Sequence, residues 1–466
     1  MGRHEDVGRH EDVGRHEDVG RHEDVGRHED VGRHGIDSTR DPPALGHTGG
    51  AVKLRSNGLP PVALAMVVGS LPVFLVGTLA VEIRHSLHFD TEALGIAIAV
   101  YYLGAASSSL PVSRLVEHVG GARVMRIAML GAAVLFALIG GLATSWAALV
   151  VLLLLAGGIS GSMNPAANLF LARRAESTHH GLVFGIKQAA VPFASLLGGL
   201  AVPAIALTVG WRWAFGAGTL LALVAAAVIP RSRTTLAEHR RRHPYAARAP
   251  VASAALITLT VGLGLGVMAS SGATAFLVSA AVSLGFAKAS AGLVAAAAGG
   301  AAVATRITIG ARADRRGGGH LRVVVLLMLV GVAGYGLLAS GTLEHSHWLF
   351  VLGALLALGG GWGYNGLFTF AVIRTHRDTP AAATGVTQIG GRLGGMLGPA
   401  VFGLVADHVS YSASWVVAAV TAAVAAAVVV VGRRLLVAAR SQSLAPGPTA
   451  SEPPAPAPGA PVPDAQ

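Results

Sequence analysis

The run Gly310-Ala-Arg-Ala-Asp314-Arg315-Arg316-Gly317 has a spacing of glycines, acid and base that points to a specific chemical role. Ser113-x-x-x-Glu117-His118-x-Gly120 is a degenerate copy that lies 197 residues earlier. A carboxylate at a helix end can accept bonds from the backbone NH groups that begin a neighbouring helix, and an arginine beside it can bridge to another carboxylate. We therefore predict a conformational latch that comprises Gly310, Asp314, Arg315, Gly317, Glu117, His118 and Gly120.

A second kind of chemistry comes from basic residues inside apolar segments. Arg392 lies about eleven residues into such a segment, or roughly 16 Å along a helix, with no Asp or Glu at the same depth. A guanidinium there must find carbonyl groups, water or an anionic ligand, and its planar geometry suits a carboxylate, nitrate-like or phosphate-like group. Packing against a neighbouring helix is the alternative. Lys187 is a weaker candidate, because a lysine near the membrane surface can extend its amine to water.

Amide side chains occur at matching places in the two halves of the chain. Such groups donate and accept, so they serve either solute recognition or bonds between helices. With the two basic residues and one tyrosine they complete the candidate solute-binding set, which is Arg392, Lys187, Gln188, Gln388, Asn164, Asn365 and Tyr364.

The elements that must position these residues follow from the spacing of charges. The chain has 466 residues, 53% hydrophobic and 13% charged, with a net charge of +11, which disfavours a soluble enzyme or a nucleic-acid binder. Charge-free intervals long enough for a membrane helix recur, whereas the strands of a membrane barrel take only ~10 residues. Twelve helical spans are predicted within 59–81, 93–113, two in 127–172, 188–211, 213–230, 251–278, 289–309, 323–343, 347–373, 381–406 and 412–431.

The same pattern divides the chain into five regions. Residues 59–230 and 251–440 are expected to form two six-helix bundles, joined by a basic linker over 231–250. The tail 1–58 contains a Gly-Arg-His-Glu-Asp-Val repeat and the tail 441–466 is rich in proline, so both are expected to be disordered. The regularly spaced histidines of the repeat allow metal binding as an alternative, but we predict no metal site and no cofactor.

Lysine and arginine counts predict the orientation. With the N-terminus inside, the connections on the cytoplasmic side hold 17 basic residues and those on the other side hold three. Both termini are therefore expected in the cytoplasm of a multi-pass protein of the cell membrane. Five tryptophans near the predicted span ends are expected to anchor at the membrane surface: Trp146, Trp211, Trp213, Trp348 and Trp415.

The twelve spans, the central basic linker and the motif at both equivalent positions resemble the major facilitator superfamily. This resemblance implies two pseudo-symmetric bundles around a central cavity that opens alternately to either side. The segment Gly185-Ile-Lys-Gln188 and the later Gly210-Trp-Arg-Trp-Ala-Phe are similar to bacterial small-anion porters of the cyanate and nitrate type. The arginine that nitrate porters carry in their second helix is absent here, because the first arginine of that region is Arg114.

From these features we predict a secondary transporter, not an enzyme, for a small anionic or polar organic solute. Export of drugs or amphipathic natural products is the alternative, and a non-transporting membrane sensor or scaffold is a remote one. The expected partners are the solute and the lipid bilayer, with no nucleic acid, and the expected state is a monomer. Coupling to a proton or a counter-ion, exchange and uniport all stay open, as do the direction and the identity of the solute.

Overall fold

A computed structural model describes residues 58–172, 180–231, 253–315, 318–376 and 379–444. The chain divides into two compact units, residues 1–54 and 55–466, and the first lies outside the described residues. The predicted tails 1–58 and 441–466 and the linker 231–250 fall outside the description as well, except for a few residues at their edges. All regular structure within the described residues is helical.

The first half of the chain forms α1 (Leu59–Thr78), α2 (Ala80–Leu87), α3 (Thr91–Val119), α4 (Gly121–Leu142), α5 (Trp146–Ala172), α6 (His180–Ala201), the π-helical turn η1 (Val202–Ala206) and α7 (Trp211–Val228). The second half forms α9 (Ala254–Ser283), α10 (Lys288–Arg315), α11 (His320–Leu343), α12 (His347–Gly359), α13 (Asn365–Thr375), α14 (Pro380–His408) and α15 (Tyr411–Leu444). Ten helices of the described residues are long and apolar enough to cross a membrane, and α12 is a shorter apolar one. Every predicted span coincides with one helix or with two consecutive helices, so the twelve-helix membrane fold is confirmed.

Helix ends differ from the predicted spans for two reasons. α3 and α10 continue to Val119 and Arg315, because a helix that leaves the membrane has no need to stop at the first charge. Conversely, the predicted span 347–373 is interrupted, since α12 ends at Gly359 and α13 starts at Asn365. Glycines surround the break at 359–361 and 363, and glycine is among the poorest residues for propagating a helix.

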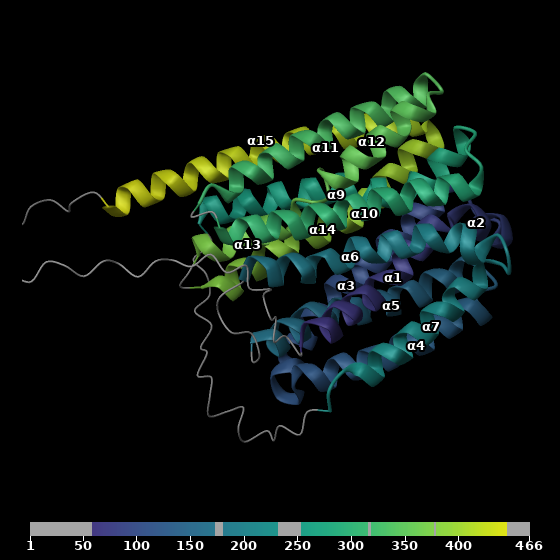
Figure 1. Cartoon of the computed structure of the whole chain (residues 1–466), viewed down its shortest axis with the longest axis horizontal. Coiled ribbons are helices and arrows are strands. Elements are labelled where there is room, and N and C mark those ends of the chain that lie inside the picture. Colours follow the sequence, from purple (N-terminus) through teal and green to yellow (C-terminus); the bar gives the residue numbers. More distant parts are fainter. Residues whose placement is uncertain (1–57, 173–179, 232–252, 316–317, 377–378, 445–466) are drawn as a thin grey trace, which may run out of the picture. The chain divides into compact units, whose positions relative to one another are not determined.

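The helix connections gather at two ends of the bundle. The proximal end, on the left in Figure 1, holds the start of α1 and the end of α15. Gly120, between α3 and α4, belongs to the same end. The distal end holds α2 and the short turns 88–90, 143–145, 207–210, 284–287, 344–346 and 409–410. Helix starts there use the caps that the sequence offers: the Asp90 carboxylate accepts from the Ala93 NH at 2.7 Å, and Ser346 caps α12 in the same way.

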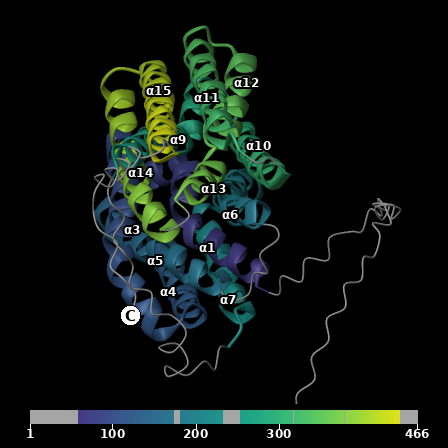
Figure 2. The same cartoon turned by 90° about the vertical axis from the view of Figure 1, so that its left-hand side faces the viewer.

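Contacts between the two halves of the chain are made by a small set of helices. α3 packs along α14, α6 packs along α10, and α1 packs against α9. Figure 2 shows α4 and α7 on one side of these helices and α11, α12 and α15 on the other. Residues Met66–Thr78 of α1 are all buried, as are Ala273–Ala281 of α9. These two helices therefore form the protein-enclosed centre, and they lie between the α3–α14 and α6–α10 interfaces.

The tryptophan prediction is partly wrong. Trp213 and Trp348 are 66% and 86% exposed, which fits side chains that meet lipid or the membrane surface. Trp415 is fully buried and makes edge-to-face contacts with the rings of Phe350 and Phe402. Trp211 is also buried, against the ring of Phe215. A ring near a helix end can face inward as readily as outward, and the position along the sequence does not decide which.

Candidate functional site

The two interfaces between the halves are built on equivalent glycines. A Cβ added at Gly95 of α3 would lie 2.4 Å from the Pro399 carbonyl oxygen of α14. A Cβ added at Gly292 of α10 would lie 2.8 Å from the Gly199 carbonyl oxygen of α6. Gly95 and Gly292 occupy matching places in the internal repeat, as do Gly199 and Pro399. Each interface therefore pairs the second span of one half with the fifth span of the other, at backbone contact.

Arg306 of α10 connects the two halves at the α6–α10 interface. Its Nη1 donates to the Gln188 carbonyl oxygen of α6 at 2.5 Å, and its Nη2 donates to the Trp362 carbonyl oxygen at 2.9 Å. The guanidinium also lies over the Trp362 ring, 5.0 Å from its centroid. Trp362 belongs to the break between α12 and α13, where carbonyl groups lack their helical partners. Arg306 therefore fixes the broken helix to the opposite half of the chain.

Arg392 of α14 makes the corresponding contact at the α3–α14 interface. It is partly buried, and its Nη1 donates to the carbonyl oxygen of Ala105 in α3. The sequence predicted a carbonyl group, water or an anion as its partner, and the carbonyl is what this conformation provides. In the part of the chain that the structure describes, neither Arg392 nor Arg306 forms an ion pair. Both charges thus lie between the halves without a carboxylate to neutralise them.

Lys187 lies next to the Arg306 contact but faces its own half. It is 4% exposed, and its Nζ donates to the Asn168 Oδ1 of α5 at 2.5 Å. Burial to this degree shows that the amine does not reach out to solvent in this conformation. Asn168 was not among the sequence candidates. The signal that could have found it is its position one helical turn after Asn164, on the same side of α5.

The amide candidates lie near the interfaces but hold few partners. Gln188 of α6 is beside Gly366 of α13, where an added Cβ would be 3.5 Å from the Gln188 Cβ. Gln388, Asn164 and Asn365 are half-buried, and their side chains have no hydrogen-bond partner among the described residues. Their unused donors and acceptors leave them available to a solute or to another conformation.

Tyr364 is enclosed within the second half of the chain. It is fully buried, and its hydroxyl points at α9, 2.2 Å from where a Cβ of Gly266 would be. That hydroxyl has no hydrogen-bond partner in the described structure. Tyr101 provides the contrast, because its equally buried hydroxyl donates to the Gly69 carbonyl oxygen at 2.7 Å.

Removing these two hydroxyl groups is expected to have different effects on stability. Tyr101→Phe breaks a buried hydrogen bond and should lower the free energy of unfolding by about 1 kcal/mol. Tyr364→Phe removes an unpaired buried hydroxyl and should leave the stability unchanged or raise it by up to about 1 kcal/mol. Thermal unfolding of the detergent-solubilised variants measures both, and a Tyr364→Phe variant as unstable as Tyr101→Phe would contradict the assignment.

The predicted latch is only partly described. Gly310 lies in α10 at the α6 interface, where an added Cβ of Gly185 would be 3.4 Å from its Cα. Gly120 has φ of 92° between α3 and α4, a conformation that favours glycine. Arg315 and His118 are exposed at the proximal ends of α10 and α3. The side chains of Asp314 and Glu117 and all of Gly317 lie outside the described residues, so the latch stays a prediction.

Comparison with known proteins now decides the family. The family model of the Major Facilitator Superfamily matches residues 62–391 and 259–462. The chain belongs to the Major Facilitator Superfamily. A comparison with curated proteins gives no significant match. The sequence resemblance to this superfamily is thereby confirmed, together with the multi-pass membrane character of the chain.

Solved structures of the same fold include a bacterial homologue of the human lysosomal transporter Spinster. Its inward-facing, unoccupied form aligns with a TM-score of 0.62 and 15% identity, over 84% of this chain and 99% of that one. Its inward-facing, occupied form aligns with a TM-score of 0.59 and 15% identity, over 83% and 98%. At this identity the likeness concerns the fold of this superfamily member and not its solute.

Arg306 is the principal residue of this superfamily member that the candidate list omitted. It lies within the predicted span 289–309, close to the proximal end of α10, where an arginine can also extend its charge to the membrane surface. Its partner Trp362 lies in the break between α12 and α13, and its partner Gln188 lies within α6, four residues before Pro192, which has no NH to offer to the Gln188 carbonyl group. The glycines at 359–361 and 363 were the available sign of that break.

Proposed function

We propose that this superfamily member is an alternating-access secondary transporter for a small anionic or polar organic solute. The observation that carries the proposal is the pair of arginines, Arg306 and Arg392, which hold uncompensated charge between the halves. Each is paired with a backbone carbonyl group of the opposite half. A carboxylate or similar anion is a stronger acceptor for a guanidinium than a neutral carbonyl group, so a solute can replace these partners.

The proposed orientation places the distal end outside the cell and both termini in the cytoplasm. The distal connections carry three basic residues, Arg84, Arg212 and Lys288, against 17 in the connections of the proximal end. Positive residues are retained on the cytoplasmic side of membrane proteins. The cell membrane as the location, the monomeric state and the two-bundle division at 231–250 belong to the same proposal.

Replacing Arg392 tests the anionic character of the solute. We expect Arg392→Ala to weaken binding of the best anion in a panel of mono- and dicarboxylates and inorganic anions by ten- to a hundredfold, because one charge-assisted contact is lost. Arg392→Lys keeps the positive charge but loses the planar guanidinium with its two parallel NH donors. Its affinity for the anion should therefore lie between those of the parent and of Arg392→Ala. Thermal-shift titration of the purified protein ranks the ligands, and flux into proteoliposomes confirms them.

Arg322→Ala is the matched control, because Arg322 is exposed near the proximal start of α11, outside both arginine contacts and outside the predicted latch. It should leave anion binding unchanged. Normal binding and flux of every anion in Arg392→Ala would contradict the anion proposal. Drug sensitivity of cells that lack the transporter would then favour the alternative, export of an amphipathic compound.

A further inference from the structure

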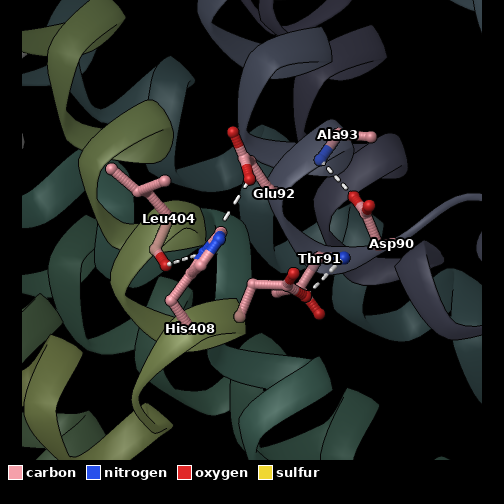
Figure 3. A network of polar contacts seen from close by, with 7 residues as sticks. Asp90, Thr91, Glu92, Ala93, Leu404 and His408 are labelled. Carbon is pink, nitrogen blue, oxygen red and sulfur yellow. Dashed lines mark hydrogen bonds and ion pairs between the residues drawn. The ribbon is translucent and has the colours of Figure 1, made fainter.

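The distal end carries charged side chains that join the two halves and that the proposed solute site does not use. Lys288 at the start of α10 pairs with Glu82 of α2 at 3.2 Å. At the second interface, His408 at the end of α14 lies 3.8 Å from Glu92 at the start of α3, measured from Nδ1 to Oε2. Figure 3 shows His408 and Glu92 facing each other across the gap between these helices.

Asp407 adds a backbone contact to the same place. Its Oδ1 accepts from the Thr91 NH of α3 at 3.3 Å, so the carboxylate of one half caps a helix of the other. Carboxylate and imidazole atoms of Glu92, Asp407 and His408 all lie within 4.8 Å of one another. The start of α3 and the end of α14 are thus joined by one carboxylate–imidazole contact and one capping bond.

The charge of His408 decides whether this arrangement is attractive. Its Nδ1 lies 3.1 Å from the Leu404 carbonyl oxygen, which can only accept, so Nδ1 carries a proton there. Protonation of the second ring nitrogen creates a cation between Glu92 and Asp407, at a helix C-terminus that favours positive charge. With a neutral ring, two carboxylates of opposite halves face each other unbalanced, and like charges at that distance repel.

The neighbouring elements supply two other basic side chains near this contact, Arg84 and His88, and in the described structure neither forms an ion pair with Glu92 or Asp407. α3 contributes Glu92, the turn before it contributes His88 and Asp90, and α2 contributes Arg84, whose Nε donates to the Phe89 carbonyl oxygen at 3.3 Å. α9, which packs against α14, has no acidic or basic residue, and α15 has Tyr411 at its distal end, while its arginines lie at the proximal end. Histidine is the side chain that ordinarily changes charge between pH 5 and 8, so the Lys288–Glu82 pair has no comparable switch.

We propose that Glu92, Asp407 and His408 form a proton-operated lock that holds the distal ends of α3 and α14 together when His408 is charged and releases them when it is neutral. Acidic conditions at the distal end therefore favour the conformation that is closed there. The lock is independent of which solute is carried. Its placement on the outside of the cell rests on the proposed orientation.

The distance between the halves at the distal end tests the lock directly. The chain has no cysteine, so spin labels at Val209→Cys and Leu343→Cys report the separation of two exposed distal sites, one in each half. In nanodiscs, where both faces meet the same buffer, the ratio of closed to open populations should fall about two- to fivefold between pH 5.5 and 8, as expected for one exposed ion pair.

Variants of His408 distinguish the lock from a general effect of pH. His408→Gln should remove the pH response and give the high-pH distribution throughout, and His408→Arg should give the low-pH distribution throughout. His85→Gln, which changes an exposed histidine of α2 at the same end, should respond like the parent. An unchanged pH response in His408→Gln, or equal behaviour of the Gln and Arg variants, would overturn the proposal.

Discussion

Arg306→Ala is expected to reduce solute flux about a hundredfold while the protein still inserts in the membrane. The substitution leaves the Gln188 and Trp362 carbonyl groups without their donor, and each unpaired buried group costs ~1–3 kcal/mol. Those two carbonyls belong to opposite halves, so the loss falls on a contact that the proposed alternating-access cycle would break and remake. It also removes one of the two charges available to an anion.

Two further variants make this expectation specific. Arg306→Lys keeps the positive charge, but its single amine nitrogen does not replace the two guanidinium nitrogens that donate to the two carbonyl groups. Its flux should therefore lie between those of the parent and the alanine variant. Arg312→Ala removes an exposed arginine from the same helix and should transport normally. Flux is measured in proteoliposomes with the best anion of the panel. Flux within threefold of the parent in Arg306→Ala would show that this contact is dispensable.

The fold could be predicted because the membrane imposes a simple rule on the sequence. Charge-free intervals of ~20 residues and helical backbone are both required by hydrocarbon, and each predicted span is indeed helical. The internal repeat could be found in the sequence because equivalent helices of the two halves meet the same packing requirements. Gly95 and Gly292 match because both must admit a neighbouring backbone, and the structure places each of them against one.

The candidate site was harder to predict, because side-chain partners depend on contacts between distant helices. Arg392 was recognised as a cation within a span, yet its partner is a carbonyl group 287 residues away in sequence. Tyr364 was a candidate solute-binding residue, but it lies just before α13 with its hydroxyl against Gly266 of α9. Neither the depth of a residue nor its type specifies the direction in which a helix presents it.

Gly95→Ala and Gly292→Ala are expected to shift the protein away from the conformation that is closed at the distal end. The added methyl would lie 2.4 Å from the Pro399 carbonyl oxygen in the first case and 2.6 Å from the Val202 Cβ in the second. Both neighbours belong to the opposite half, so the strain is relieved when the halves separate. Overpacking of this kind costs ~1–3 kcal/mol, which corresponds to about a five- to 150-fold change in the closed-to-open ratio.

A glycine within one half separates this effect from simple destabilisation. Gly157→Ala would place a methyl 1.9 Å from the Tyr101 carbonyl oxygen, between α5 and α3 of the same half, so it should lower the unfolding temperature without changing the closed-to-open ratio. Gly141→Ala meets no atom within 4 Å and should change neither property. The distal spin-label pair reports the ratio, and thermal unfolding reports stability.

If Gly95→Ala lowers the unfolding temperature as Gly157→Ala does but leaves the distance distribution unchanged, the α3–α14 contact is a fixed part of the fold. A changed distribution with little loss of stability instead identifies it as a contact that opens and closes, because only a contact that is broken in the alternative state can release its strain there.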